Sequence, residues 1–195
     1  MEPAIQQHLR EIFESGRRHD ETEADHSKRF LNLEPDTARL ISILARSSHR
    51  TRVLEIGTST GYSTIWLAWS VRPGGGRVTT IERDAAKGRI AEENLRKSGL
   101  LESVDLQLGD ATTVVAEISG PFDMVFFDAD RITAPAQLRL LVPKLTRDAL
   151  VLADNALSHP SEIADYLQAV ESLPGFEHLV VPIGKGLSLA YRPEL

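Results

Sequence analysis

The sequence predicts an α/β protein built on an open, mostly parallel sheet. From residue 52 onward, short apolar runs alternate with longer amphipathic stretches. Several apolar runs end in an acidic residue, and the alternation stops at two β-rich runs near the C-terminus. Such alternation is typical of βαβ units, in which a helix connects neighbouring parallel strands. We therefore expect a single domain over residues 1–195, with an α/β core over residues 51–195.

The first fifty residues predict a helical cap on this core. One amphipathic helix is expected from residue 1 to about residue 29. A second begins near Pro35, because proline suits the first turn of a helix. The expected apolar faces hold Ile5, Leu9, Ile12 and Phe13 in the first helix and Leu40, Ile41, Ile43 and Leu44 in the second.

The strands of the core are predicted from five apolar runs and from the tail. The five runs are "RVLEIG", "RVTTIE", "VDLQLGD", "FDMVFFDAD" and "ALVLADN". The tail "EHLVVPIGKGLSLAYR" holds two further β-rich runs joined by Ile183–Gly186. This pattern predicts an antiparallel pair at the edge of the sheet.

Composition narrows the functional classes. The chain has no cysteine, which excludes disulfides, thiolate zinc sites and a cysteine nucleophile. No apolar run approaches the ~18 residues of a membrane span, and the mixed, acidic N-terminus is unlike a signal peptide. A net charge of −6 argues against a nucleic-acid partner, since duplex binders usually carry a basic stripe. We expect a cytoplasmic protein without membrane or nucleic-acid partners.

Polar residues finish the predicted strands. In open α/β sheets, ligands bind outside the carboxyl ends of the strands. The residues at these ends are Glu55 and Gly57, then Glu82, Asp110, Asp128 and Asp130, and finally Asp154 and Asn155. Asp and Asn at single positions are also typical of turns and helix N-caps. Carboxylates gathered on one rim repel each other unless a cation is present, so the rim predicts a cationic ligand.

The loop "RVLEIGTSTGYS" resembles a dinucleotide fingerprint but lacks two of its glycines. The three glycine positions of that fingerprint are occupied here by Gly57, Ser59 and Tyr62. Glu55, just before the loop, would repel a pyrophosphate. Glu82, 21 residues after Gly61, stands where an acid can accept both hydroxyls of a ribose. A cationic nucleoside without phosphate, such as S-adenosylmethionine, fits this loop. The alternative is that the loop is only a plain strand-to-helix turn.

The ordered motifs resemble the cation-dependent small-molecule O-methyltransferases, which include catechol and caffeoyl-CoA O-methyltransferases. The resemblance rests on "VLEIGTSTGYSTIWLA", "VTTIERD", "LGDA", "FDMVFFDAD", "LVLADN" and "PIGKGLSLAYR", and it covers about residue 35 to the C-terminus. It implies a Rossmann-like, seven-stranded class I methyltransferase sheet, mostly parallel with an antiparallel C-terminal edge pair. It also implies S-adenosylmethionine as the donor, a divalent cation and a homodimer.

The resemblance assigns site residues one by one. It places Glu55, Gly57, Thr58 and Ser63 at the methionine end of the cofactor, Glu82 at the ribose, and Asp110 and Ala111 at the adenine, and Asp130 completes the cofactor site. The residues matching the metal ligands are Asp128, Asp154 and Asn155. Independently, Asp128 and Asp154 are 26 residues apart, the length of one strand–helix–strand step. Their oxygen atoms suit a hard cation, Mg²⁺ first, with Mn²⁺ or Ca²⁺ as alternatives.

The sequence departs from the family at the expected proton acceptor. The family usually has a lysine after the D-A-D motif, but this chain has Arg131. An arginine side chain stays protonated, so it cannot act as a base, although it can stabilise a phenolate. His159, four residues after Asn155, is the candidate base. The alternative is that His159 is only a surface residue before Pro160.

These features lead to one functional hypothesis and two alternatives. The hypothesis is a metal- and S-adenosylmethionine-dependent O-methyltransferase that acts on a small hydroxylated aromatic, catechol-like or phenolic. One alternative is a methyltransferase of the same fold that modifies a hydroxylated tRNA base. The other is a protein that binds S-adenosylmethionine but has impaired catalysis, which Arg131 would explain.

Overall fold

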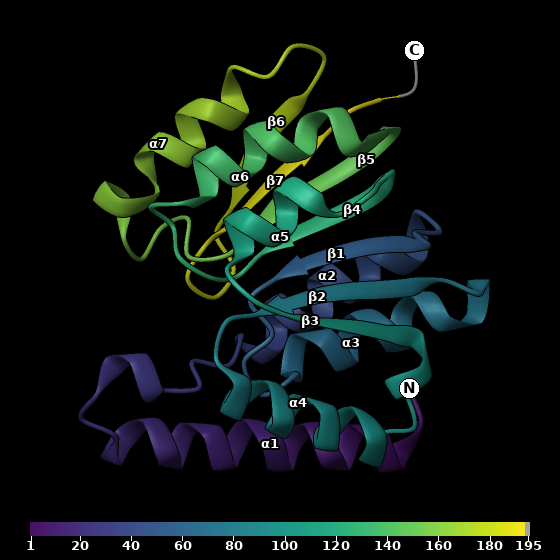
Figure 1. The fold of residues 1–195 in the computed structure, drawn as a ribbon, viewed down its shortest axis with the longest axis vertical. Helices are drawn as coiled ribbons and strands as arrows, with labels where there is room; N and C mark the ends of the chain where they lie inside the picture. Colours follow the sequence, from purple (N-terminus) through teal and green to yellow (C-terminus); the bar gives the residue numbers. More distant parts are fainter. Residues whose placement is uncertain (194–195) are drawn as a thin grey trace.

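The computed structural model describes residues 1–193 and holds a seven-stranded sheet between two layers of helices (Figure 1). The strands are β1 (Arg52–Ile56), β2 (Arg77–Glu82), β3 (Val104–Leu108), β4 (Phe122–Phe127), β5 (Leu145–Ala153), β6 (Glu177–Val181) and β7 (Leu187–Tyr191). Their order across the sheet is β3-β2-β1-β4-β5-β7-β6. Strands β1 to β5 run parallel, and β7 is antiparallel to both of its neighbours.

This topology confirms the predicted sheet. The parallel part winds outward from β1 in one direction and from β4 in the other, so the strand order reverses between these two strands. A reversal of this kind leaves a crevice at the carboxyl ends of the strands. The C-terminal pair lies at the edge as predicted, with β7 inside and β6 outermost. The turn Ile183–Gly186 joins the two strands, and the Gly186 amide donates to the Ile183 carbonyl at 2.8 Å.

The helices cover both faces of the sheet. They are α1 (Pro3–Thr22), α2 (Pro35–Ser47), α3 (Tyr62–Val71), α4 (Ala85–Lys97), α5 (Ala111–Glu117), α6 (Ala134–Leu141) and α7 (Pro160–Glu171), with short 3-10 turns η1 (His26–Lys28), η2 (Arg72–Gly74), η3 (Leu101–Ser103) and η4 (Val142–Lys144). One buried cluster joins α1 to α4 to the sheet, and a second joins α5 to α7 to its other face. Alternate residues of one strand enter different clusters: Val53 packs on the first face and Leu54 on the second.

The first helix is shorter than predicted. It ends at Thr22, not near residue 29, because the Asp20 carboxylate accepts hydrogen bonds from the Phe30 and Leu31 amides, at 2.7 and 2.8 Å. These bonds turn residues 23–31 back across the end of the helix. One residue of the second helix was also assigned wrongly. Ile43 is 52% exposed, because it lies about 200° around the helix axis from the buried Ile41.

Candidate active site

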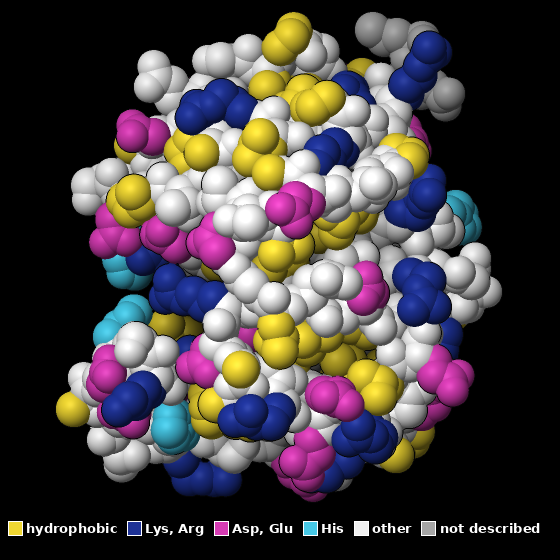
Figure 2. All heavy atoms as spheres, in the orientation of Figure 1, with side chains coloured by type: hydrophobic (Ala, Val, Ile, Leu, Met, Phe, Trp, Pro, Cys, Tyr) yellow, Lys and Arg dark blue, Asp and Glu magenta, His cyan; other side chains and the backbone are white. Residues whose placement is uncertain are grey.

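The carboxyl ends of four adjacent strands bring the predicted acids to one side of the molecule. Strands β2, β1, β4 and β5 are neighbours in this order, and they end near Glu82, Glu55, Asp128 and Asp154. Figure 2 shows a hollow on the side where the strand arrows of Figure 1 end, bordered by acidic and basic side chains. The sheet therefore gathers residues that are far apart in the sequence.

Glu55 is the most deeply buried of these acids. Its side chain is inaccessible to solvent, and its Oε2 accepts hydrogen bonds from the hydroxyls of Thr64 and Thr80. Burial raises the pKa of Glu55 to about 7, an effect that the nearby hydroxyls, including that of Ser63, partly oppose. Within residues 1–193, its second oxygen, Oε1, has no hydrogen-bond partner. A cationic ligand at this end of β1 would stabilise the ionised carboxylate.

Glu82 is held in place by backbone amides. Its Oε2 accepts from the Ser59 amide and its Oε1 from the Asp84 amide, both at 2.8 Å. Each carboxylate oxygen has a second lone pair, so both can still accept a hydroxyl group. The fixed carboxylate, 7% exposed, is therefore ready to bind a vicinal diol.

The loop between β1 and α3 has no room for side chains at its glycines. Gly57 has a φ of +102°, and Gly61 has a φ of +81°. A β-carbon on Gly61 would lie 3.3 Å from Ala91 of α4. Thr58, between them, is buried, and its hydroxyl lies 2.6 Å from that of Thr80. The glycines thus keep the loop close to its neighbours.

Asp128 and Asp154 form a pair of interacting carboxyl groups. Burial raises the pKa of both groups, and the charge of Asp154 raises the pKa of Asp128 further. In the described part of the chain, Asp154 Oδ1 is buried without a hydrogen-bond partner. Asn155, next to it, adopts a left-handed conformation with a φ of +65°. Such a pair is stable in its ionised form only beside a positive charge.

The chemistry of these donors fits a hard divalent cation. No three His, Cys, Asp or Glu side chains of residues 1–193 lie close enough together to hold a metal. A cation bound by Asp128 and Asp154 would therefore need its third protein ligand from another residue type, and the amide oxygen of Asn155 is adjacent in the chain. Waters and substrate oxygens commonly complete the coordination of Mg²⁺.

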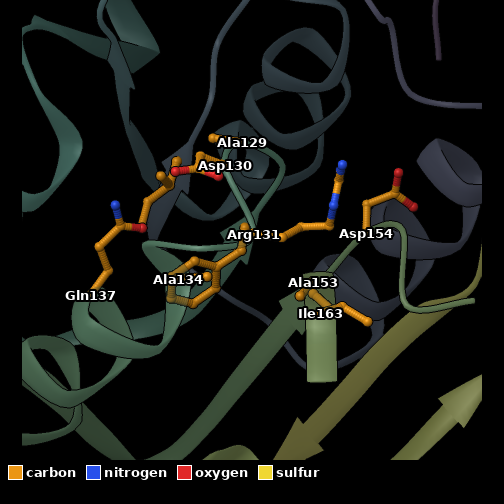
Figure 3. Close-up of a pocket in the computed structure, with 10 residues that line it drawn as sticks. Ala129, Asp130, Arg131, Ala134, Gln137, Ala153, Asp154 and Ile163 are labelled. Carbon is orange, nitrogen blue, oxygen red and sulfur yellow. The ribbon is translucent and has the colours of Figure 1, made fainter. Parts of the chain in front are cut away.

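Arg131 enters a narrow cavity beside this pair (Figure 3). The cavity is lined by the apolar residues Ile56, Phe127, Ala153 and Ile163 and by the polar residues Asp130, Arg131, Gln137 and Asp154. The Arg131 side chain is 20% exposed and pairs with Glu162 of α7. A fixed cation of this kind can stabilise an anion that forms in the site.

Three predicted cofactor residues lie at the start of a helix or in a turn. Asp110 caps α5, where its side chain accepts from the Thr113 amide at 3.0 Å. Ala111 is the first residue of that helix, so both lie at the end of the outer strand β3. The Asp130 side chain accepts from the Ile132 amide at 3.1 Å, within a turn. All three stand on the carboxyl edge of the sheet.

His159 lies outside the Arg131 cavity. Its side chain is exposed, and Nδ1 lies 2.8 Å from the hydroxyl of Ser158. That hydroxyl is also 3.2 Å from Asn155 Oδ1, so one turn connects His159 to the predicted ligand. The geometry thus places the histidine near the site but not among the residues that line this cavity.

Two residues that the sequence did not single out also border the site. Lys185 pairs with Glu34 at 3.0 Å, and the pair lines a cavity of about 280 Å³ next to α1. Backbone bonds from Ala156 and Leu157 to the turn Ile183–Gly186 hold Lys185 near Asp154. Each residue is a single charge in a loop, and no sequence pattern signals that such residues meet.

The seven-stranded sheet, mostly parallel with an antiparallel C-terminal pair and helices on both faces, is the fold of the class I methyltransferases. The chain has the fold of the solved structure of an O-methyltransferase from Bacillus cereus in complex with SAH. The TM-score is 0.83 at 22% sequence identity, and the match covers 96% of this chain and 91% of that one. At this identity, the likeness shows the fold alone.

The chain belongs to the O-methyltransferase family, whose model matches residues 7–192. It is 30% identical over 131 residues to a catechol O-methyltransferase of Niastella koreensis, a match that covers 65% of this chain and 59% of that protein. It is 36% identical over 120 residues to a catechol O-methyltransferase of Mycobacterium tuberculosis, covering 61% of this chain and 54% of that protein. The chain thus spans little more than half the length of these relatives. No helix among the described residues has the length and apolar character to cross a membrane.

Proposed function

We propose that this chain is an S-adenosylmethionine-dependent O-methyltransferase that uses a divalent cation and methylates a small catechol-like or phenolic acceptor. One observation carries the proposal. In a member of the O-methyltransferase family, four neighbouring strands end at Glu55, Glu82, Asp128 and Asp154. Their negative charges match a cationic donor and a divalent metal ion better than they match any phosphate ligand.

The donor would lie across the ends of β1 and β2. The Glu82 carboxylate, fixed by two amides, would accept the ribose hydroxyls. Glu55, Gly57, Thr58 and Ser63 would surround the methionine end, where the buried carboxylate balances the positive charge. Asp110 and Ala111 would border the adenine, and Asp130 would complete the site. The fixed Glu82 carboxylate and the buried Glu55 carboxylate support this assignment.

Asp128, Asp154 and Asn155 would hold the divalent cation. Its preferred identity is Mg²⁺, with Mn²⁺ or Ca²⁺ as alternatives, because all three donors are oxygen atoms. When bound, such a cation supplies Lewis-acid chemistry that lowers the pKa of an acceptor hydroxyl from about 10. The unpartnered Oδ1 of Asp154 and the raised pKa values of the pair support this proposal.

Two further residues would stabilise the negative charge of the acceptor and accept its proton. Arg131 would stabilise the phenolate, since a guanidinium donates hydrogen bonds but cannot take up a proton. His159 would accept the proton, because its Nδ1 faces Ser158 and its Nε2 has no partner among the described residues. The acceptor oxygen would then attack the methyl carbon in line with the sulfur, the bond from that carbon to the sulfur would break, and S-adenosylhomocysteine would leave. This requires both reactants to be held close together.

A methylation assay tests this function. The protein is incubated with S-adenosylmethionine, Mg²⁺ and a panel of catechols and caffeate-like acceptors, and bulk tRNA is tested in parallel. Methyl transfer to the small acceptors supports the proposal, and transfer only to tRNA would replace it with the tRNA alternative. S-adenosylmethionine binding without transfer to any acceptor would indicate impaired catalysis. We also propose a homodimer, which sedimentation equilibrium tests.

A further inference from the structure

Arg131 is anchored through one edge of its guanidinium group. Its Nε and Nη2 both donate to Glu162 Oε2, at 3.0 and 2.6 Å. The residues belong to different parts of the chain: Arg131 follows β4, and Glu162 lies in the first turn of α7. The Arg131 side chain is 20% exposed, and that of Glu162 is 45% exposed. The ion pair thus fixes a long side chain that would otherwise be flexible.

Glu162 is mounted on a rigid element. Pro160 begins α7, and the next residue after Glu162, Ile163, is 1% exposed in the core. An acidic side chain in the first turn of a helix is favoured by the partial positive charge there. The helix therefore restrains the Glu162 carboxylate, which in turn restrains the guanidinium of Arg131.

The position of Arg131 matters because a second carboxylate lies close by. Figure 3 shows the Arg131 side chain extending from its loop toward Asp154, and both residues line the same cavity. Asp154 Oδ1 is buried with no partner in the described chain. The ion pairs found in residues 1–193 nevertheless include Arg131 with Glu162 and not with Asp154. Without Glu162, the guanidinium would have a free carboxylate within the same cavity.

We propose that Glu162 is a positioning residue that holds Arg131 beside Asp154 but off it. This leaves the Asp154 oxygens for the divalent cation and keeps the guanidinium for the acceptor phenolate. The inference rests on the proposed function, in which Asp154 is a metal ligand. It assigns Glu162 an action through Arg131, without contact with the metal or the acceptor.

The test measures Mn²⁺ affinity and catalysis in the full chain bound to S-adenosylhomocysteine. Glu162→Gln is expected to raise the Mn²⁺ Kd about tenfold, because Arg131 then pairs with Asp154. In the double variant, Glu162→Gln with Arg131→Met, the Mn²⁺ Kd returns toward the wild-type value, whereas kcat on a catechol stays low. Asp165→Asn, an exposed acid on the same helix, is the matched control and changes neither quantity.

Two results would overturn the proposal. One is an unchanged Mn²⁺ Kd and kcat in Glu162→Gln. The other is a double variant that binds Mn²⁺ as weakly as Glu162→Gln alone, since Arg131 would then not be the intermediary. A wild-type protein that binds no Mn²⁺ would instead contradict the proposed function itself, so the two failures are distinguishable. Thermal unfolding of each variant verifies that the fold is intact.

Discussion

A β-carbon on Gly57 would lie 2.2 Å from the backbone oxygen of Asp128. The loop after β1 therefore passes directly against the end of β4, at the point where the strand order of the sheet reverses. This contact joins the two halves of the proposed site. Gly57 belongs to the proposed donor loop, and Asp128 belongs to the proposed metal pair.

Gly57→Ala is expected to damage both halves at once. The substitution forces a side chain into a φ of +102° and against the Asp128 backbone, which cannot move cheaply. The free energy of unfolding should fall by about 3 kcal/mol. Chemical denaturation measures this loss. Gly99→Ala is the control, since it also has a positive φ but no neighbour within 4 Å of the added carbon. If both variants lost the same free energy of unfolding, backbone strain alone would explain the loss, and the contact with Asp128 would contribute nothing.

The buried Glu55 predicts a pH dependence of stability. Its pKa is about 7 in the fold, against an ordinary value of 4.5. The stabilising contribution of the protonated form is complete below pH 4.5 and is lost as the pH rises through 7. Glu55→Gln should remove this loss, so that the variant is more stable than the wild type at pH 8 by about 2–3 kcal/mol.

Denaturation of the ligand-free proteins at pH 5.5 and pH 8 measures the effect of Glu55→Gln. The exposed Glu102→Gln serves as the control, because it removes the same charge at the surface. If wild type and Glu55→Gln lost the same stability between these pH values, the raised pKa would be wrong.

Glu82→Gln is expected to weaken donor binding. The carboxylate is the proposed acceptor for two ribose hydroxyls, and hydrogen bonds to a charged group contribute more than neutral ones. The Kd of S-adenosylmethionine should rise about tenfold or more, as measured by calorimetry. Glu102→Gln should leave the Kd unchanged. Wild-type affinity in Glu82→Gln would remove this residue from the donor site.

His159→Asn tests the proton acceptor. Asparagine suits the N-cap position that His159 occupies before α7 but cannot take the proton. Under the proposed function, kcat on a catechol should fall by about tenfold or more, with little change in the Kd of the donor. His49→Asn, between α2 and β1, is the control. An unchanged kcat would leave Arg131 as the residue that acts on the acceptor.

The sheet could be predicted from the sequence because its signals are local. The run "FDMVFF" is apolar at every position except Asp123, and every residue of β4 is buried between two helical layers. The acids at the strand ends could also be named, since strand ends in a parallel sheet share one edge. Asp128 and Asp154 were found in this way, without any knowledge of their contacts.

Features that depend on distant contacts could not be predicted. The end of α1 is set by the bond from the Phe30 amide to Asp20, which overrides a helical pattern that continues past Thr22. Likewise, Glu162 and Lys185 are ordinary surface charges in the sequence. Their importance comes from partners that only the folded chain brings near.

The most direct test of the proposed function is the metal dependence of methyl transfer. Wild-type protein that has been treated with EDTA and desalted is assayed on a catechol with S-adenosylmethionine, before and after Mg²⁺ is added. The proposed function predicts little activity without the cation and recovery with it, and no recovery in Asp154→Ala, which removes a proposed ligand. Full activity in the treated protein, or recovery in Asp154→Ala, would contradict the assignment of Asp128, Asp154 and Asn155 as the metal site.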